Sequence, residues 1–445
     1  METGSRPIPR ARGATRALAV AALLLLALPA TGRSQAFLRA DPSARAMAMG
    51  GAATATVRDA GAVYHHAAGI VHLPGTQVLA TGFASSDETR LRLFGDREFD
   101  EEDGPRFDGA LYVTHQIAQQ VTAGIAVTEP WYLDVDWEGP TTFAGRFRAS
   151  EARLRSLDVK PVVAIGPFDR WSLALGVDAL HADLDLQRFE QDPALSALGG
   201  GGPISLARTL IESDATGVGW NASVAFRPDP RVTLGARFDS EIEVVFNGFA
   251  DFAVVAPTAL REVVLPDSES TVGAMLDARF LDQPVRIPIV FPRRAAAGVS
   301  VRAFEPLELT VDAAWVDWGA VDSLAVLFAD TLIGDSTAWP LRGAWSVRVG
   351  TEVEARSGML IRLGYAWQES GGAEPTATPV APAAGSDSFA AGVGFLWSGL
   401  TLDLAYRLTL FEDTEGVAFP ANSTVADGVY EGLEHRLAIG ISRSL

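Results

Sequence analysis

The stretch LTLDLAYRLTL at residues 400–410 alternates apolar and polar side chains without interruption. One face carries Leu400, Leu402, Leu404, Tyr406, Leu408 and Leu410, and the other carries Thr401, Asp403, Ala405, Arg407 and Thr409. A period of two is the period of an extended strand, and about 9–11 tilted residues cross the hydrocarbon layer of a membrane. The stretch therefore predicts a membrane-spanning strand with one face toward lipid and the other toward a lumen.

The same alternation recurs from about residue 76 to the last residue and predicts about fourteen strands. The connectors between them are short and long by turns, and the short ones lie at residues 119–120, 166–170, 228–231, 304–306, 356–358 and 398–399. Short turns at one end and long loops at the other are typical of an up-and-down barrel in an outer membrane. We predict an all-β fold in which residues 76–445 form an antiparallel transmembrane barrel with long external loops.

The composition excludes several classes of function. The net charge of -19 and the single lysine, Lys160, argue against a nucleic-acid partner, because binding phosphates requires clustered cations. The chain has no cysteine, which excludes disulfide scaffolds, thiolate metal sites and cysteine nucleophiles. Its six histidines form no recognisable motif with a nearby serine, so we expect neither an enzyme nor a cofactor.

The N-terminus has the pattern of an export signal. Arginines at positions 6, 10, 12 and 16 precede the apolar run Ala17–Leu28, which is too short to span a membrane as a helix. We expect residues 1–36 to be a signal peptide cleaved after Ala36, with Gly32 as the alternative site. An exported chain of alternating strands is expected in the outer membrane of a Gram-negative cell.

Residues 37–75 differ from the rest because Ala and Gly dominate and alternation is weak. We expect this segment to fold into the lumen as a plug, or hatch. Its stretch SARAMAMGGAATATVRDAGAVYHHAAG at Ser43–Gly69 resembles the hatch sequence of the FadL-type outer-membrane transporters of long-chain fatty acids and hydrocarbons. Residues 140–164, 231–249, 309–326 and 360–395 extend that resemblance over nearly all of the mature chain.

The resemblance implies a 14-stranded barrel plugged by a hatch. It also implies uptake of hydrophobic small molecules through capture by external loops, a pocket beside the hatch and lateral exit through the wall. The hatch residues implied in this chain are Asp59, Ala60, His66, Ala67, Ala68 and Gly69. The chain departs from the family at His66-Ala67-Ala68, where an Asn-Pro-Ala triplet is usual.

Two external loops are rich in apolar residues and are candidates for substrate capture. The first contributes Leu195, Leu198, Ile204, Leu206, Leu210 and Ile211, and the second contributes Leu260, Val263, Val264, Leu265 and Met275. Exposed apolar loops either pack on one another or receive a ligand, and the sequence leaves both readings open. In the third strand, Gly124 and Pro130 favour a kink that would open the wall.

Charges on the polar strand faces are expected in the lumen, notably Arg348, Arg362, Asp403 and Arg407. The arginines either bind a fatty-acid carboxylate or pair with Asp403, Glu352 and Asp239. His65, His66 and His72 cluster in the hatch without a carboxylate at ligand spacing, so we expect hydrogen bonding there and no metal site.

The expected partners are a hydrophobic small molecule, outer-membrane lipid and lipopolysaccharide, with the protein acting as a monomer. The acidic loop at residues 87–103 is expected to be solvated, with cation bridging to lipopolysaccharide as a second reading. Two other functions stay open. One is an outer-membrane scaffold or shuttle for secreted protein cargo, which needs no apolar path through the barrel. The other is a general porin, which needs an open lumen.

Overall fold

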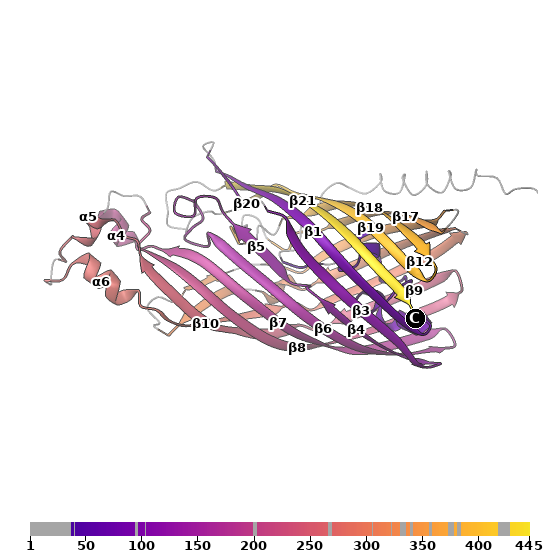
Figure 1. The fold of residues 1–445 in the computed structure, drawn as a ribbon. Helices are drawn as coiled ribbons and strands as arrows, with labels where there is room; N and C mark the ends of the chain where they lie inside the picture. The colour runs from indigo at the N-terminus through magenta and orange to yellow at the C-terminus, as the bar shows by residue number, and fades with distance from the viewer. Residues whose placement is uncertain are drawn as a thin grey trace, which may run out of the picture.

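The computed structural model describes residues 37–39, 41–93, 97–102, 104–198, 203–265, 269–304, 306–321, 323–329, 335–338, 341–355, 358–372, 378–380, 384–416 and 428–445. The expected signal peptide and the run Gly199–Gly202 lie outside these residues. The described chain forms one closed antiparallel barrel of fourteen strands, elongated toward the end that carries α4 (Pro193–Leu198), α5 (Thr258–Arg261) and α6 (Val272–Arg279) (Figure 1). The predicted fold class is thereby confirmed.

The fourteen wall strands follow one another around the barrel in chain order. They are β1 (Thr76–Leu93), β3 (Arg106–Ala118), β4 (Val121–Thr128), β6 (Glu151–Phe168), β7 (Trp171–Glu190), β8 (Ala207–Asp229), β9 (Val232–Asp239) continued by β10 (Ile242–Val254), β11 (Gln283–Phe291) continued by β12 (Arg294–Phe304), β13 (Leu307–Val316), β16 (Ala344–Glu354), β17 (Met359–Gln368), β18 (Ser386–Trp397), β19 (Leu400–Phe411) and β21 (Gly428–Ser444). The last strand pairs with the first, from Gln77 opposite Ser444 to Leu93 opposite Gly428, and this closes the barrel.

Shorter elements complete the fold. They are the strands β2 (Glu98–Asp100), β5 (Tyr132–Asp136), β14 (Ser323–Phe328), β15 (Asp335–Ala338) and β20 (Thr414–Gly416), and the helices α2 (Ala44–Ala48), α3 (Ala62–His65), η1 (Ala67–His72) and η2 (Trp318–Ala320). Among the residues that the structure describes, none of the helices is long and apolar enough to cross a membrane.

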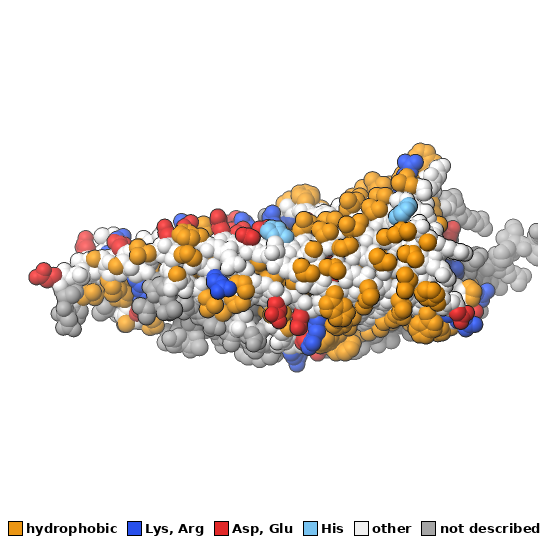
Figure 2. Space-filling model, turned by 90° about the horizontal axis from the view of Figure 1, so that it is seen from below, with side chains coloured by type: hydrophobic (Ala, Val, Ile, Leu, Met, Phe, Trp, Pro, Cys, Tyr) orange, Lys and Arg blue, Asp and Glu red, His pale blue; other side chains and the backbone are white. Residues whose placement is uncertain are grey.

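Apolar side chains cover the outside of the half of the barrel that carries the short turns, as Figure 2 shows on one face. On β21, Leu437, Ile439 and Ile441 are about half exposed, whereas Arg436 points inward and is 2% exposed. A charged residue on the lipid face costs up to ~2–4 kcal/mol at mid-membrane. The alternation seen in the sequence therefore sorts charges into the lumen and apolar groups onto the lipid face.

The segment before β1 lies inside the barrel, where α2 contacts β17, β18, β19 and β21 and η1 contacts β4, β6, β7 and β8. Small residues make this close packing possible. Gly50 adopts a φ of +63°, and a Cβ added to Gly364 on β17 would lie 2.0 Å from the Gly50 nitrogen. The hatch backbone thus rests directly on the backbone of the wall.

Two sequence expectations about this region need correction. Leu210 and Ile211, expected in an external loop, lie in β8, which begins at Ala207 because its pairing with β7 continues beyond the apolar belt. The kink expected at Gly124 and Pro130 in the third strand falls at Pro130 alone, since β4 pairs without a break through Gly124 to Thr128 and the chain resumes pairing only at Tyr132 in β5.

Candidate functional site

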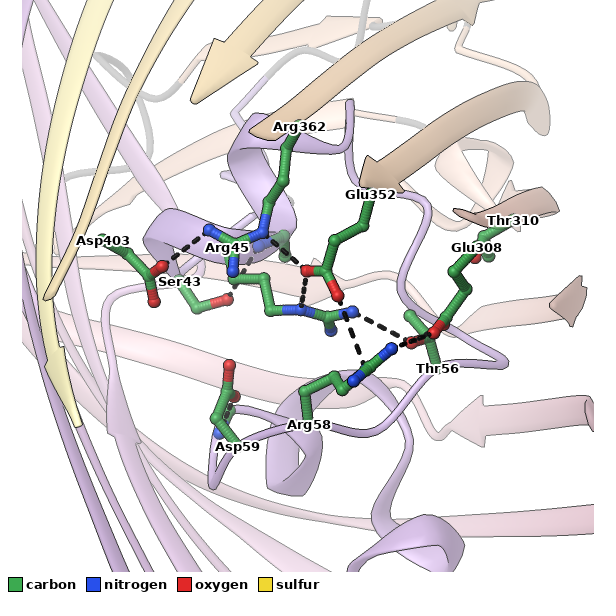
Figure 3. Close-up of polar contacts among 12 residues, drawn as sticks. Ser43, Arg45, Thr56, Arg58, Asp59, Glu308, Thr310, Glu352, Arg362 and Asp403 are labelled. Atoms are coloured by element: carbon green, nitrogen blue, oxygen red, sulfur yellow. Dashed lines mark hydrogen bonds and ion pairs between the residues drawn. The ribbon is translucent and has the colours of Figure 1, made fainter. Parts of the chain in front are cut away.

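Buried ion pairs fasten the hatch to the wall of the barrel (Figure 3). The Arg45 Nε of α2 lies 2.9 Å from Glu352 Oε2 on β16, and the Arg362 Nε of β17 lies 2.7 Å from the same oxygen. Arg362 also reaches Asp403 Oδ1 on β19 at 2.6 Å. All four side chains are almost completely buried, so each charge depends on its partner for stability.

The same network continues toward the short-turn end of the barrel. Arg58 of the hatch lies 2.8 Å from Glu308 Oε2 and 3.4 Å from Glu352 Oε1, and Thr56 donates a hydrogen bond to Glu308. Asp59, close to these arginines, accepts the Gly61 N–H at 2.8 Å, and burial raises its pKa. Wall carboxylates on two strands, Glu308 on β13 and Glu352 on β16, therefore hold the hatch in place.

A second set of pairs holds the start of the hatch. Asp41 Oδ2 accepts a hydrogen bond from Arg407 at 2.9 Å, and Asp41 Oδ1 lies 3.9 Å from Arg348. Burial acts to raise the pKa of Asp41, but the two arginines outweigh it and hold the pKa below its usual range. Arg407 also binds Glu434 at 2.9 Å. The lumen arginines named from the sequence thus pair with carboxylates of the hatch and the wall, and the fourth lumen residue, Asp403, pairs with one of them, Arg362.

Two of the three hatch histidines, His65 and His66, are buried, whereas His72 is half-buried. Burial and the neighbouring arginines lower the pKa of His66 to about 3, and the same causes lower that of His65 to about 3. His66 packs against Gly235 of β9 and Gly69, while Ala68 N–H donates to Ser223 at 2.7 Å. Ala60 and Ala67 are buried in the same packing. Within the described ranges, no group of three or more His, Asp or Glu residues is placed to hold a metal ion.

The wall has an interruption in its third strand. β4 pairs with β3 from Leu111 opposite Val127 to Ala118 opposite Val121. Within the described residues, residues 106–110 of β3 pair with β1 on one side and with no strand on the side of β4. Pro130 lies in the gap between β4 and β5, whereas Gly124 lies in unbroken pairing and meets Val63 and Ile70 of the hatch. The strand pairing of the wall is therefore interrupted at residues 129–131, and this interruption is called the opening below.

The N-terminal end of the described hatch covers this opening. Arg39 N–H donates to Pro130 O at 2.8 Å, and Tyr132 N–H donates to Phe37 O at 3.0 Å, so residues 37–39 act as a short strand in place of β3. Arg39 also pairs with Asp108 on the unpaired edge of β3, and Asp108 binds Arg436 at 2.8 Å. The sequence did not reveal this contact, because the partners come from distant parts of the chain.

Four aromatic side chains meet behind the covered opening. Phe37 lies 4.9 Å from Trp318 and 5.9 Å from Trp131, measured between ring centroids, and Trp131 lies 5.2 Å from Phe291. Sequence reasoning missed this aromatic cluster. The one signal for it was Trp318, which belongs to the conspicuous WVDW stretch at residues 315–318.

A single buried apolar cluster connects the aromatic cluster with the external helices. It runs from Leu260 of α5 and Leu276 of α6 through Phe246 on β10 to Phe37. The capture residues Leu195, Leu206, Ile211 and Leu260 belong to this cluster, and Ile204, Leu265 and Met275 pack against it. Val263 and Val264 are exposed, Leu210 is half-buried on β8, and Leu198 ends α4 with its side chain outside the described part.

Two cavities adjoin the aromatic cluster and share Phe37 and Leu133 in their linings. One is apolar, about 40 Å³, and is otherwise lined by side chains such as Leu154, Leu186 and Ile287. The other, about 230 Å³, is lined jointly by the hatch and the wall and includes Asp41, Arg348 and Arg407 among its polar lining residues. A small apolar cavity and a larger cavity of mixed lining thus meet at Phe37, next to the covered opening.

A closed barrel with an apolar outer belt, a lumen filled by its own N-terminal segment and an interrupted wall defines a plugged outer-membrane barrel. A sequence model of the outer membrane protein transport family (OMPP1/FadL/TodX) matches residues 29–438, and the chain belongs to this family. It is accordingly an outer-membrane protein of a family of transport proteins, not of enzymes.

Individual relatives are distant. The long-chain fatty acid transport protein of Salmonella typhi is 25% identical over 167 residues, which are 36% of this chain and 38% of that protein. The alignment with the protein of the same name from Escherichia coli O6:H1 has 24% identity over 151 residues and covers 31% of this chain and 33% of that protein. The chain therefore aligns with less than half the length of these relatives.

Solved structures match over almost their whole length. A Pseudomonas aeruginosa FadL homologue superposes with a TM-score of 0.77 at 14% identity, covering 92% of this chain and 99% of that chain. The toluene transporter TodX of P. putida superposes with a TM-score of 0.73 at 16% identity, covering 91% of this chain and 99% of that chain. At these identities the likeness shows the fold.

Proposed function

We propose that the protein takes up hydrophobic small molecules, long-chain fatty acids or hydrocarbons, across the outer membrane. The observation that carries this proposal is the unbroken apolar cluster from α5 and α6 to Phe37 at the interrupted third strand. A scaffold for protein cargo has no need of such a path. A general porin would need a lumen without the ion-paired hatch.

Capture takes place at the external helices. Val263 and Val264 are exposed there, next to Leu260 and Leu276, which are buried in the apolar cluster. A hydrophobic solute that binds here displaces the water around these side chains. It gains about 25 cal/mol for each Å² of apolar surface that is removed from water. Most other capture residues already pack on each other, so the entering molecule must separate them transiently.

From the external helices the substrate moves to the cavities beside the hatch. Phe37 bounds both cavities, which makes its ring a stand-in for a hydrophobic substrate. A substrate that displaces Phe37 also withdraws residues 37–39 from Pro130 and Tyr132. Displacement then uncovers the opening at Glu129–Trp131, and the substrate leaves sideways into the membrane.

The proposal assigns roles to the remaining parts of the chain. Residues 1–36 act as the export signal, residues 37–75 act as the gating hatch, and residues 76–445 form the barrel. One chain closes the barrel and lines the whole route, which supports a monomer as the working unit within lipid and lipopolysaccharide.

A reversible crosslink over the opening tests the route. Leu38 and Trp131 form an antiparallel bridge, and such partners lie within disulfide range. Because the chain has no cysteine, the pair Leu38→Cys and Trp131→Cys provides the only thiols. In cells that lack their own fatty-acid transporter, the oxidised pair should block uptake of labelled oleate and of labelled hydrocarbon, and reduction should restore it.

The two single cysteine variants are the controls, since each carries the same side-chain loss without the crosslink. Uptake that is equally fast in the oxidised and reduced double variant would show that the substrate does not leave at this opening. Uptake no faster than in cells without the protein, for the wild type and both substrate classes, would refute the transport function itself.

A further inference from the structure

A small polar pocket of about 30 Å³ lies between the hatch and the wall at the short-turn end of the barrel. The hatch contributes Thr56 and Arg58 to its lining. The wall contributes Arg227 and Arg231 from the β8–β9 turn region and Arg302 from the end of β12. External helices and short turns occupy opposite ends of the barrel, so this pocket faces the periplasm and is separate from the hydrophobic route (Figure 1).

The pocket carries more positive charge than its own carboxylate can neutralise. Four arginines line it together with one acidic residue, Glu308. Glu308 is already engaged, because it binds Arg58 at 2.8 Å and accepts hydrogen bonds from Thr56 and Ser300. Glu308 also attracts Arg227, but one carboxylate cannot neutralise four guanidinium groups, so the lining keeps three positive charges in excess, in a chain whose net charge is -19.

Of the three wall arginines, Arg227 is half-buried, whereas Arg231 and Arg302 are exposed. Over the described part of the chain, Arg227, Arg231 and Arg302 form no ion pair, and the buried Arg227 Nε has no hydrogen-bond partner. Asp229 of the adjoining turn accepts the backbone N–H of Arg231 at 2.9 Å and pairs with none of the guanidinium groups. Buried polar groups in proteins are normally hydrogen-bonded, so a buried N–H without a partner indicates a missing acceptor.

We propose that this pocket binds a phosphate group that bridges the hatch and the wall. Guanidinium groups match phosphate oxygens bidentately, and three uncompensated charges favour a dianion over a single carboxylate. The group comes either from free inorganic phosphate or from a phospholipid head group. The three wall arginines hold the phosphate, and because Thr56 and Arg58 of the hatch line the same pocket, the bound group contacts hatch and wall together at a site distinct from the hydrophobic pocket.

Binding of inorganic phosphate to the purified wild-type protein in a phosphate-free detergent buffer provides the test, measured by calorimetry and by ³¹P NMR line width. Arg227→Gln and Arg302→Gln should each weaken binding roughly tenfold, the usual effect of losing a charge-assisted hydrogen bond. Arg443→Gln is the matched control, since Arg443 is exposed on β21 at the same end and does not line the pocket. Heat-dependent mobility on a gel verifies that each variant is a folded barrel.

A second arm identifies the source of the phosphate group with short-chain phosphatidylglycerol as the probe and phosphatidylcholine as its comparison. Saturable phosphate binding that the two pocket variants weaken supports a free-ion site. Binding of phosphatidylglycerol alone, weakened by the same variants, supports a head-group site. Absence of binding by both probes, or equal binding by the pocket variants and the wild type, overturns the proposal.

Discussion

Replacing Arg45 with Met measures how firmly the ion pairs hold the hatch. The substitution removes one charge and keeps an unbranched side chain of similar length. Arg45 is 6% exposed and its partner Glu352 is 2% exposed, so the pair is screened very little by water. We expect Arg45→Met to weaken docking of the hatch and to leave the wall strands unchanged.

The size of the effect follows from burial. Removing one partner of a buried ion pair costs about 3–5 kcal/mol, because the other charge stays buried without compensation. Glu352 retains Arg362 at 2.7 Å, which places the expected loss at about 3 kcal/mol. A loss of about 3 kcal/mol raises the population of the undocked hatch roughly a hundredfold.

Hydrogen exchange followed by mass spectrometry measures that population. Met47 N–H donates to Ser43 O at 2.9 Å within α2, so its exchange requires the hatch to open locally. Arg58→Met is the matched control, because Arg58 binds Glu308 and Glu352 but is 39% exposed and should cost about 1 kcal/mol or less. Unchanged exchange of α2 in Arg45→Met, or equal acceleration in both variants, would refute this account of the hatch.

Two further predictions concern packing and pH. Gly364→Ala should loosen the hatch, because the added Cβ would lie 2.0 Å from the Gly50 nitrogen, and hydrogen exchange of α2 should become faster. Gly104→Ala is the control, since a Cβ added there has no neighbouring atom within 4 Å and exchange should stay unchanged. Docking of the hatch should weaken as pH falls from 6.5 to 5, because an undocked His66 with the usual pKa near 6.5 binds a proton that the docked His66, with its pKa of about 3, does not. His65 has the same lowered pKa, so His66→Gln should reduce the pH dependence of α2 exchange and the double variant His65→Gln, His66→Gln should flatten it. An equally steep dependence in the double variant would assign it to other groups.

The strands and their faces were predictable because they depend on near neighbours in the chain. Leu437, Ile439 and Ile441 face lipid as their spacing indicates, since successive side chains of a strand point to opposite sides. The short turns were predictable for the same reason. The start of β8 was misplaced, because pairing with β7 extends a strand beyond the membrane and no local signal marks that length.

The candidate site was predictable only in its location. Pro130 indicated an interruption in the third strand, but the sequence did not show that Phe37 and Arg39 cover the gap. The arginines Arg348 and Arg407 were expected in the lumen, but their shared partner, Asp41 of the hatch, was not. Such contacts join residues hundreds of positions apart, and many pairings are equally compatible with the sequence.

The sequence by itself determined the barrel: its alternating strands, the short turns that join them at one end, and the segment of small residues that precedes them. Period-two alternation and membrane thickness impose this result strand by strand. Only the tertiary structure decided which charges meet, how residues 37–39 cover the wall, and that Phe37, Trp131 and Trp318 gather at one point. Closing the barrel brings distant strands around a common lumen, and burial there makes each charge require a partner that no local pattern specifies.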